Sequence, residues 1–92
     1  MKPRAVLLDV RSQAEFQTGH LEGAVNVPHD EISGRIAEAV PEKNTPLYLY
    51  CRSGRRVKIA METLRKLNYT QLYDLGGLKE AQQQLQLPVL KK

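Results

Sequence analysis

Apolar and polar positions along the chain fall into blocks of two kinds. Four short blocks are dominated by aliphatic or aromatic residues, as in strands that a sheet buries: 5–10, 23–28, 46–50 and 71–73. Four other blocks carry helix-start signals or repeat apolar residues at helical spacing: 14–17, 30–40, 56–67 and 78–85. Because strands and helices alternate along the chain, we predict an α/β domain with a central, mostly parallel sheet flanked by helices.

Local signals predict where several of these elements begin and end. Ser12 followed by Glu15 is a capping-box pattern, which predicts the start of the first helix. Asp30 is predicted to cap the second helix, and residues 74–77 are predicted to form a turn. We expect the tail, 86–92, to be irregular because it contains a proline and ends in two lysines.

The length and composition of the chain are those of one small domain. Its 92 residues are 41% apolar and 26% charged, as in ordinary globular proteins, so we assign 1–92 to a single domain. No apolar run approaches the ~18–20 residues of a membrane span, and no signal-peptide pattern opens the sequence. We expect a monomer that is cytoplasmic as given, or periplasmic if a signal peptide has been removed.

Positive charge is concentrated in one place. The chain has fourteen basic and ten acidic residues, and four of the basic ones closely follow the cysteine: Arg52, Arg55, Arg56 and Lys58. Without these four, ten basic residues balance the ten acidic ones. Nucleic-acid binding favours a broader basic face, whereas a compact cluster beside a thiol suits a small anion. We therefore expect a small anionic partner, and neither a nucleic acid nor a membrane.

The sequence contains a single cysteine, Cys51, which limits the chemistry open to it. One cysteine excludes an internal disulfide and a zinc site built from several cysteines. A metal site made of Cys51, His20 and His29 would match no spacing typical of metal ligands. We expect no metal and no other cofactor.

Residues 50–57 place Cys51 between a strand and a helix, with Gly54 in the turn. A helix N-terminus presents unpaired N–H groups and the positive end of the helix dipole, and successive loop amides form an anion-binding nest. Together with the arginines, these features favour the thiolate over the thiol. Gly54 permits backbone conformations that a side chain hinders. The segment therefore predicts a nucleophilic cysteine inside an anion-binding loop.

The loop 51–56 is one of three motifs that occur in a recognisable order. A segment in three parts precedes it: 8–11, 15–16 and 19–28. The glycine pair 76–77 follows it. Together they resemble the active-site loop, the N-terminal signature and the glycine pair of the rhodanese family, the thiosulfate sulfurtransferases. The resemblance covers 5–82, and the stretch 35–44 is similar to small single-domain members of the family.

The resemblance implies a small α/β fold around a parallel sheet and a reaction in two halves. Cys51 would attack the outer sulfur of thiosulfate, release sulfite and keep a persulfide, from which cyanide or a thiol would take the sulfur. The residues then expected to bind substrate are Arg52, Ser53, Gly54, Arg55, Arg56 and Val57. In the family a cationic loop goes with thiosulfate and a more neutral loop with mercaptopyruvate, so the resemblance favours thiosulfate.

Two other functions stay open at this point. The first is a persulfide carrier or interaction module, because the family includes such domains, although many of them lack the cysteine. The second is a cysteine-dependent phosphatase or arsenate reductase, which uses a thiolate in a Cys-x5-Arg motif. Arg56 stands one position short of that spacing and Val57 occupies it. A shorter loop forms a narrower cradle, which suits one sulfur atom better than a phosphoryl group.

Three polar residues near the motifs are expected to be structural. Asp9 and Arg11 are predicted to hold the first loop, with Arg11 contacting Glu15 or backbone carbonyls. His20 is predicted to be a buried, hydrogen-bonded histidine. We assign none of the three a catalytic role.

Overall fold

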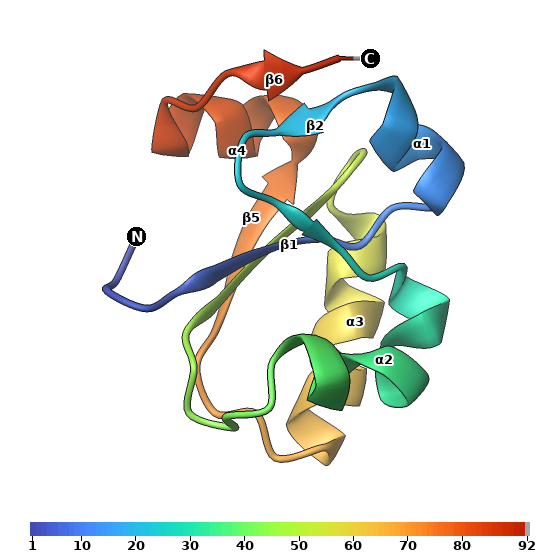
Figure 1. The fold of residues 1–92 in the computed structure, drawn as a ribbon, viewed down its shortest axis with the longest axis vertical. Coiled ribbons are helices and arrows are strands. Elements are labelled where there is room, and N and C mark those ends of the chain that lie inside the picture. Colours follow the sequence, from blue (N-terminus) through green and yellow to red (C-terminus); the bar gives the residue numbers. More distant parts are fainter. Residues whose placement is uncertain (92) are drawn as a thin grey trace.

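The computed structural model describes residues 1–91 (Figure 1). In it, short apolar segments form strands and segments with helical spacing form helices. The strands are β1 (Val6–Asp9), β2 (His20–Leu21), β3 (Val25–Asn26), β4 (Leu47–Cys51), β5 (Leu72–Gly77) and β6 (Val89–Leu90). The helices are α1 (Gln13–Thr18), α2 (Ile32–Ala39), α3 (Arg55–Lys66) and α4 (Leu78–Leu85), with the 3-10 turn η1 (His29–Glu31) before α2. In the described part of the chain, no helix combines the length and the apolar character that crossing a membrane requires.

Strands β3, β1, β4 and β5 form a parallel sheet in that order, which confirms the predicted α/β fold. Asp9 at the end of β1 lies opposite Tyr50 on β4, and Cys51 lies opposite Gly77 on β5. The carboxyl ends of parallel strands meet at one edge of a sheet, and ligands bind there in open α/β folds. In this protein that edge holds Asp9, Cys51 and Gly77.

Alternation along β4 divides the core between the two faces of the sheet. Leu49 and Cys51 belong to the buried cluster that α2 and α3 cover, whereas Tyr48 and Tyr50 pack in the cluster that α4 covers. Figure 1 shows α2 and α3 on one side of the sheet and α4 on the other. Because successive strand side chains point to opposite faces, Cys51 points toward the face covered by α3, the helix that follows it.

The C-terminal tail is more regular than the sequence indicated. Within the predicted irregular tail, 86–92, the strand β6 pairs antiparallel with β2, which places Leu90 opposite His20. That prediction is wrong for these residues, and Lys92 lies outside the described part of the chain. A strand of two residues is too short to show alternation in the sequence, and its partner is remote along the chain.

Local signals are confirmed at the start of α1 and wrong at two other places. The Ser12 side chain accepts the N–H of Glu15, whose side chain accepts the N–H of Ser12 in return. Asp30 lies inside η1 and does not cap α2, which begins without a side-chain cap. Residues 74–77 continue β5 and do not form the predicted turn; the register of β5 on β4 shifts between Leu49 and Cys51. The strand predicted over 23–28 is shortened to β3.

Candidate active site

Cys51 is the last residue of β4, and the turn after it leads directly into α3. Its Sγ atom lies 2.8 Å from the backbone nitrogen of Gly54, which donates a hydrogen bond to the sulfur. Gly54 is the N-cap residue of α3 and has a φ of 94°, in the left-handed region that favours glycine. The sulfur therefore receives a peptide N–H at the positive end of a helix.

The Cys51 side chain is more enclosed than the sequence indicated. Its exposed fraction is 0%, and it belongs to the same core cluster as Val10 and Val57. The sulfur nevertheless stays within hydrogen-bond reach of a peptide nitrogen. In this structure the Cys51 side chain therefore presents no exposed surface to an anion.

The glycine pair 76–77 packs closely against the backbone of the cysteine loop. A Cβ atom on Gly77 would lie 2.5 Å from the backbone oxygen of Arg52, a contact that forces one of the two segments to move. A Cβ atom on Gly54 would lie 3.3 Å from the Cα atom of Gly76. Because these positions carry no side chains, the end of β5 can pack directly against the backbone of the cysteine loop.

Of the three arginines in the loop, one is committed to a contact within the protein. Arg56 donates from Nη1 and Nη2 to the two carboxylate oxygens of Glu15, at 2.7 and 2.9 Å. Arg52 and Arg55 are exposed, and within residues 1–91 neither forms an ion pair. The guanidinium group of Arg56, which the sequence predicts to bind substrate, contacts Glu15 in this structure. Arg52 and Arg55 keep their charge available for an anion.

The remaining two residues expected to bind substrate differ in their surroundings. Ser53 is exposed. Val57 is fully buried in the core, so its side chain does not face a ligand. Chain continuity brings 51–57 together as predicted, but only some of their side chains face solvent.

Sequence reasoning missed Glu15 as a contact of the loop. Its carboxylate caps α1 through Ser12 and also binds Arg56, which lies 41 residues further along the chain. The Arg56 hydrogen bonds, foremost among several contacts, lower the pKa of Glu15 from 4.5 to about 2. The opposite charges were visible in the sequence, but no local pattern places α1 beside the start of α3. The pair ties these two helices together.

We expect the protein to lose stability in acid as Glu15 becomes protonated and its contribution to folding is lost. A carboxyl group with a lowered pKa stabilises the fold fully above its unfolded pKa of 4.5, and this contribution is lost as the pH falls toward about 2. Urea unfolding over this range should show a steeper loss of stability for the wild type than for Glu15→Gln. Glu38→Gln, which changes an exposed glutamate of α2, is the control and should keep the wild-type slope. If stability fell with pH equally steeply in Glu15→Gln and the wild type, the result would contradict a stabilising contact between Glu15 and Arg56.

Asp9, the last residue of β1, forms a buried ion pair with Arg11. Arg11 Nη2 lies 2.7 Å from Asp9 Oδ2 and also donates to the carbonyl oxygen of Gly19. Asn26 Nδ2 donates to the carbonyl oxygens of Asp9 and Arg11, each at 3.0 Å. These contacts support the structural role predicted for the pair. They hold the first loop through Gly19 and not through Glu15.

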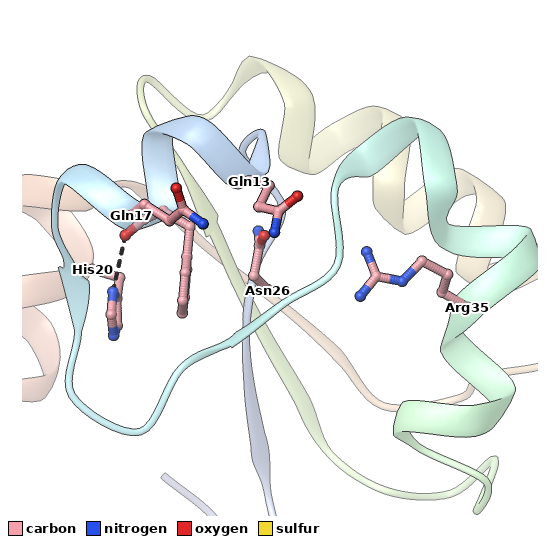
Figure 2. Close-up of a pocket in the computed structure, with 6 residues that line it drawn as sticks. Gln13, Gln17, His20, Asn26 and Arg35 are labelled. Carbon is pink, nitrogen blue, oxygen red and sulfur yellow. Dashed lines mark hydrogen bonds between the residues drawn. The ribbon is translucent and has the colours of Figure 1, made fainter.

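A hollow of about 500 Å³ lies among α1, β2, β3 and α2 (Figure 2). The residues that line it are Gln13, Phe16, Gln17, His20, Asn26 and Arg35. Phe16 and His20 stack with ring centroids 3.8 Å apart, and His20 Nδ1 lies 3.0 Å from the carbonyl oxygen of Phe16. His20 is thus hydrogen-bonded as predicted, although it is half-buried rather than buried. None of the six lining residues belongs to the cysteine loop, so the hollow is separate from the site.

The structure does not bring Cys51, His20 and His29 together as metal ligands. Within residues 1–91, no group of three or more histidine, cysteine, aspartate or glutamate side chains is arranged to hold a metal ion.

Comparison with known proteins agrees with this geometry. The family described as "Rhodanese-like domain" matches residues 1–84. The chain belongs to the rhodanese family. This rhodanese is 42% identical over 73 residues to the thiosulfate sulfurtransferase PspE of Escherichia coli (strain K12), a match that covers 79% of this chain and 70% of PspE. It is also 42% identical over 78 residues to the uncharacterized protein YqhL of Bacillus subtilis (strain 168), covering 84% of this chain and 60% of YqhL.

A solved structure supports the same assignment. The structure described as a rhodanese with anions from E. coli has a TM-score of 0.85 to this rhodanese at 38% identity, and the match covers 96% of this chain and 99% of that one. The likeness confirms the fold over nearly the whole length. Together with PspE, it places the protein among the rhodanese-family sulfurtransferases.

Proposed function

We propose that this rhodanese moves the outer sulfur of thiosulfate to cyanide or a thiol through a persulfide on Cys51. In the first half of the reaction, the Cys51 thiolate attacks the outer sulfur of thiosulfate. A bond from Sγ to that sulfur forms, the sulfur–sulfur bond of thiosulfate breaks, and sulfite leaves with the electron pair. In the second half, cyanide or a thiolate attacks the outer sulfur of the persulfide, and Sγ leaves as the thiolate.

The observation that carries the proposal is the hydrogen bond from Gly54 N–H to Cys51 Sγ. A peptide N–H at a helix start stabilises the negative charge on the sulfur before attack, and the same donor is in place for the persulfide. The exposed guanidinium groups of Arg52 and Arg55 add attraction for dianionic thiosulfate. The name of PspE, a thiosulfate sulfurtransferase, supports the same donor.

Steady-state kinetics test the proposed function. With thiosulfate and cyanide as substrates, we expect thiocyanate to form with parallel lines in double-reciprocal plots, the ping-pong pattern of a covalent intermediate. Intersecting lines would mean that both substrates bind before sulfur moves, which would rule out a free persulfide intermediate.

Arg52→Ala is expected to weaken the binding of thiosulfate. Removing one exposed charge should raise the KM for thiosulfate about three- to fivefold, as expected from losing the interaction of one solvent-exposed charge pair. The change in kcat should be smaller. Lys91→Ala removes the charge of an exposed lysine in the tail and serves as the control. An equal rise in KM for both variants would show that general positive charge, and not the loop, recruits the donor.

The geometry opposes a phosphatase. The arginine of a Cys-x5-Arg motif would stand at position 57, where Val57 is fully buried in the core. The neighbouring Arg56 is bound to Glu15 and does not substitute for it. We therefore expect no hydrolysis of a generic aryl phosphate under conditions in which thiocyanate forms. Clear phosphatase turnover without sulfur transfer would favour a phosphatase over the proposed sulfurtransferase.

The complete burial of Cys51 favours one second candidate function, a persulfide carrier that hands its sulfur to another protein. A persulfide without exposed surface is shielded from small nucleophiles, and a partner protein that exposes it would gain access to it. Slow thiocyanate formation together with fast sulfur transfer to a protein thiol would favour the carrier. Fast thiocyanate formation favours the enzyme.

A further inference from the structure

The hollow among α1, β2, β3 and α2 lies apart from the cysteine loop, and we call it the α1 hollow (Figure 2). Its volume is about 500 Å³, and pockets for small organic ligands have roughly 300–1,000 Å³. The residues that line it offer two aromatic rings, three side-chain amides and one guanidinium group: Gln13, Phe16, Gln17, His20, Asn26 and Arg35. The α1 hollow therefore combines aromatic surface with a few polar groups, as ligand sites do.

Phe16 gives the α1 hollow an aromatic surface that the core does not use. It is the only phenylalanine of the chain, and within residues 1–91 it belongs to neither of the two buried clusters. Its half-buried ring stacks on that of His20, with centroids 3.8 Å apart and an angle of 9° between the planes. Flat aromatic groups stack on such a surface, so an aromatic ring is the first feature that a ligand should have.

Asn26 presents a fixed acceptor oxygen. Its Nδ2 atom donates to the carbonyl oxygens of Asp9 and Arg11, each at 3.0 Å, so both amide hydrogens are engaged. Oδ1 accepts no hydrogen bond from residues 1–91, and in that range no unpartnered side-chain oxygen is buried. Oδ1 is therefore open to solvent and held in one orientation, and a ligand N–H is the group that complements it.

Arg35 supplies the α1 hollow with a positive charge, and none of the six lining residues is acidic. Figure 2 shows its guanidinium group pointing from α2 toward Asn26, and the two residues also line a second hollow together, so they lie close to each other. Arg35 Nη1 donates to Glu31 at 3.1 Å, and both side chains are about half exposed. Because an exposed pair of this kind contributes little to stability, a ligand carboxylate can take the place of Glu31.

We propose that the α1 hollow binds an N-acylated aromatic amino acid. The ring lies on the stacked rings of Phe16 and His20, the amide N–H donates to Asn26 Oδ1, and the carboxylate binds Arg35. These groups follow one another in the ligand as their partners do in the hollow, where Figure 2 shows Asn26 between His20 and Arg35. A neutral acylated nitrogen suits the hollow better than an ammonium group, because Arg35 is charged and no lining residue is acidic.

Titration of the ¹⁵N-labelled protein, followed by its amide resonances, tests the proposal without any sulfur donor and so independently of the proposed function. N-acetyl-L-phenylalanine should cause saturable shifts at the residues that line the α1 hollow. Three relatives each lack one group: N-acetyl-L-phenylalaninamide lacks the carboxylate, 3-phenylpropanoate the N–H, and N-acetyl-L-cyclohexylalanine the flat ring. Each should bind at least about threefold more weakly, as expected from losing one exposed charge pair, one hydrogen bond or one stacking contact. Shifts that do not saturate, or equal binding of all four compounds, would overturn the proposal.

The last residue of a peptide that ends in phenylalanine carries the same three groups as a free N-acylated amino acid. A tetrapeptide of three glycines and a C-terminal phenylalanine separates these two sources. If it binds within about tenfold of N-acetyl-L-phenylalanine, the α1 hollow accepts the end of a peptide chain. Weaker binding assigns the hollow to a free small molecule, and both results support the ligand class.

Two variants and one control test the contact with the carboxylate. Arg35→Gln should weaken the binding of N-acetyl-L-phenylalanine about three- to fivefold and leave that of the amide unchanged, as expected from losing one exposed charge pair. Glu31→Gln should strengthen it, because the group that competes with the ligand for Arg35 is removed. Arg65→Gln removes an exposed arginine of α3 that does not line the α1 hollow, and it should change neither affinity. Equal effects of Arg35→Gln and Arg65→Gln would mean that general positive charge attracts the ligand, which would overturn the proposed site.

Discussion

Replacing Cys51 by serine is expected to abolish sulfur transfer. Serine lacks the sulfur that accepts the sulfane atom, and its hydroxyl is a far weaker nucleophile than a thiolate. Removal of a covalent nucleophile costs many orders of magnitude, so we expect thiocyanate formation to fall by more than about a thousandfold. The measurement is the initial rate of thiocyanate formation with saturating thiosulfate and cyanide.

The fold of Cys51→Ser should survive, because serine is slightly smaller than cysteine and its oxygen accepts the N–H that Gly54 donates to Sγ. A far-UV circular dichroism spectrum and a cooperative unfolding transition like those of the wild type are the control. Wild-type activity in a folded Cys51→Ser variant would refute the persulfide scheme.

Gly77→Ala is expected to produce the second-largest loss of activity. The new Cβ atom would lie 2.5 Å from the backbone oxygen of Arg52 and 3.0 Å from Oε2 of Glu80. Gly77 has a φ of −84°, which any residue adopts, so the collision alone causes the effect. The loop must shift to relieve it, and misplacing a catalytic group by about 1 Å lowers activity roughly a hundredfold. We also expect a loss of about 1–3 kcal/mol in the free energy of unfolding, as for other overpacked sites.

Gly34→Ala is the matched control for this substitution. Gly34 lies in α2, and a Cβ atom there has no heavy atom within 4 Å. The change should leave activity unaltered and raise the free energy of unfolding by about 0.5–1 kcal/mol, the helix preference of alanine over glycine. Equal activities for Gly77→Ala and Gly34→Ala would show that the close contact between β5 and the loop has no part in catalysis.

The strand–cysteine–helix segment could be predicted because its parts are contiguous. The apolar run before Cys51 and the helical spacing after Gly54 are local patterns, and the observed β4 and α3 differ from the predicted 46–50 and 56–67 by one residue at each end. Chain connectivity alone then places the thiol at the start of a helix. The order of strands and helices predicted the parallel sheet in the same way.

The features that sequence reasoning missed all depend on contacts between remote segments. The ion pair of Glu15 with Arg56 arises because α1 packs beside the start of α3. The pairing of β2 with β6 joins two short segments from opposite halves of the chain. The enclosure of Cys51 results from the cluster that α2, α3 and the sheet form together. No local pattern encodes these three-dimensional neighbours.

The most direct test of the account is the intact mass of the protein after incubation with thiosulfate and removal of small molecules. A persulfide predicts a gain of one sulfur atom that peptide mapping places on Cys51 and that cyanide removes as thiocyanate. Cys51→Ser should show no gain under the same conditions. An unchanged mass for the wild type, or a sulfur atom that Cys51→Ser also acquires, would contradict the claim that this thiol carries the transferred sulfur.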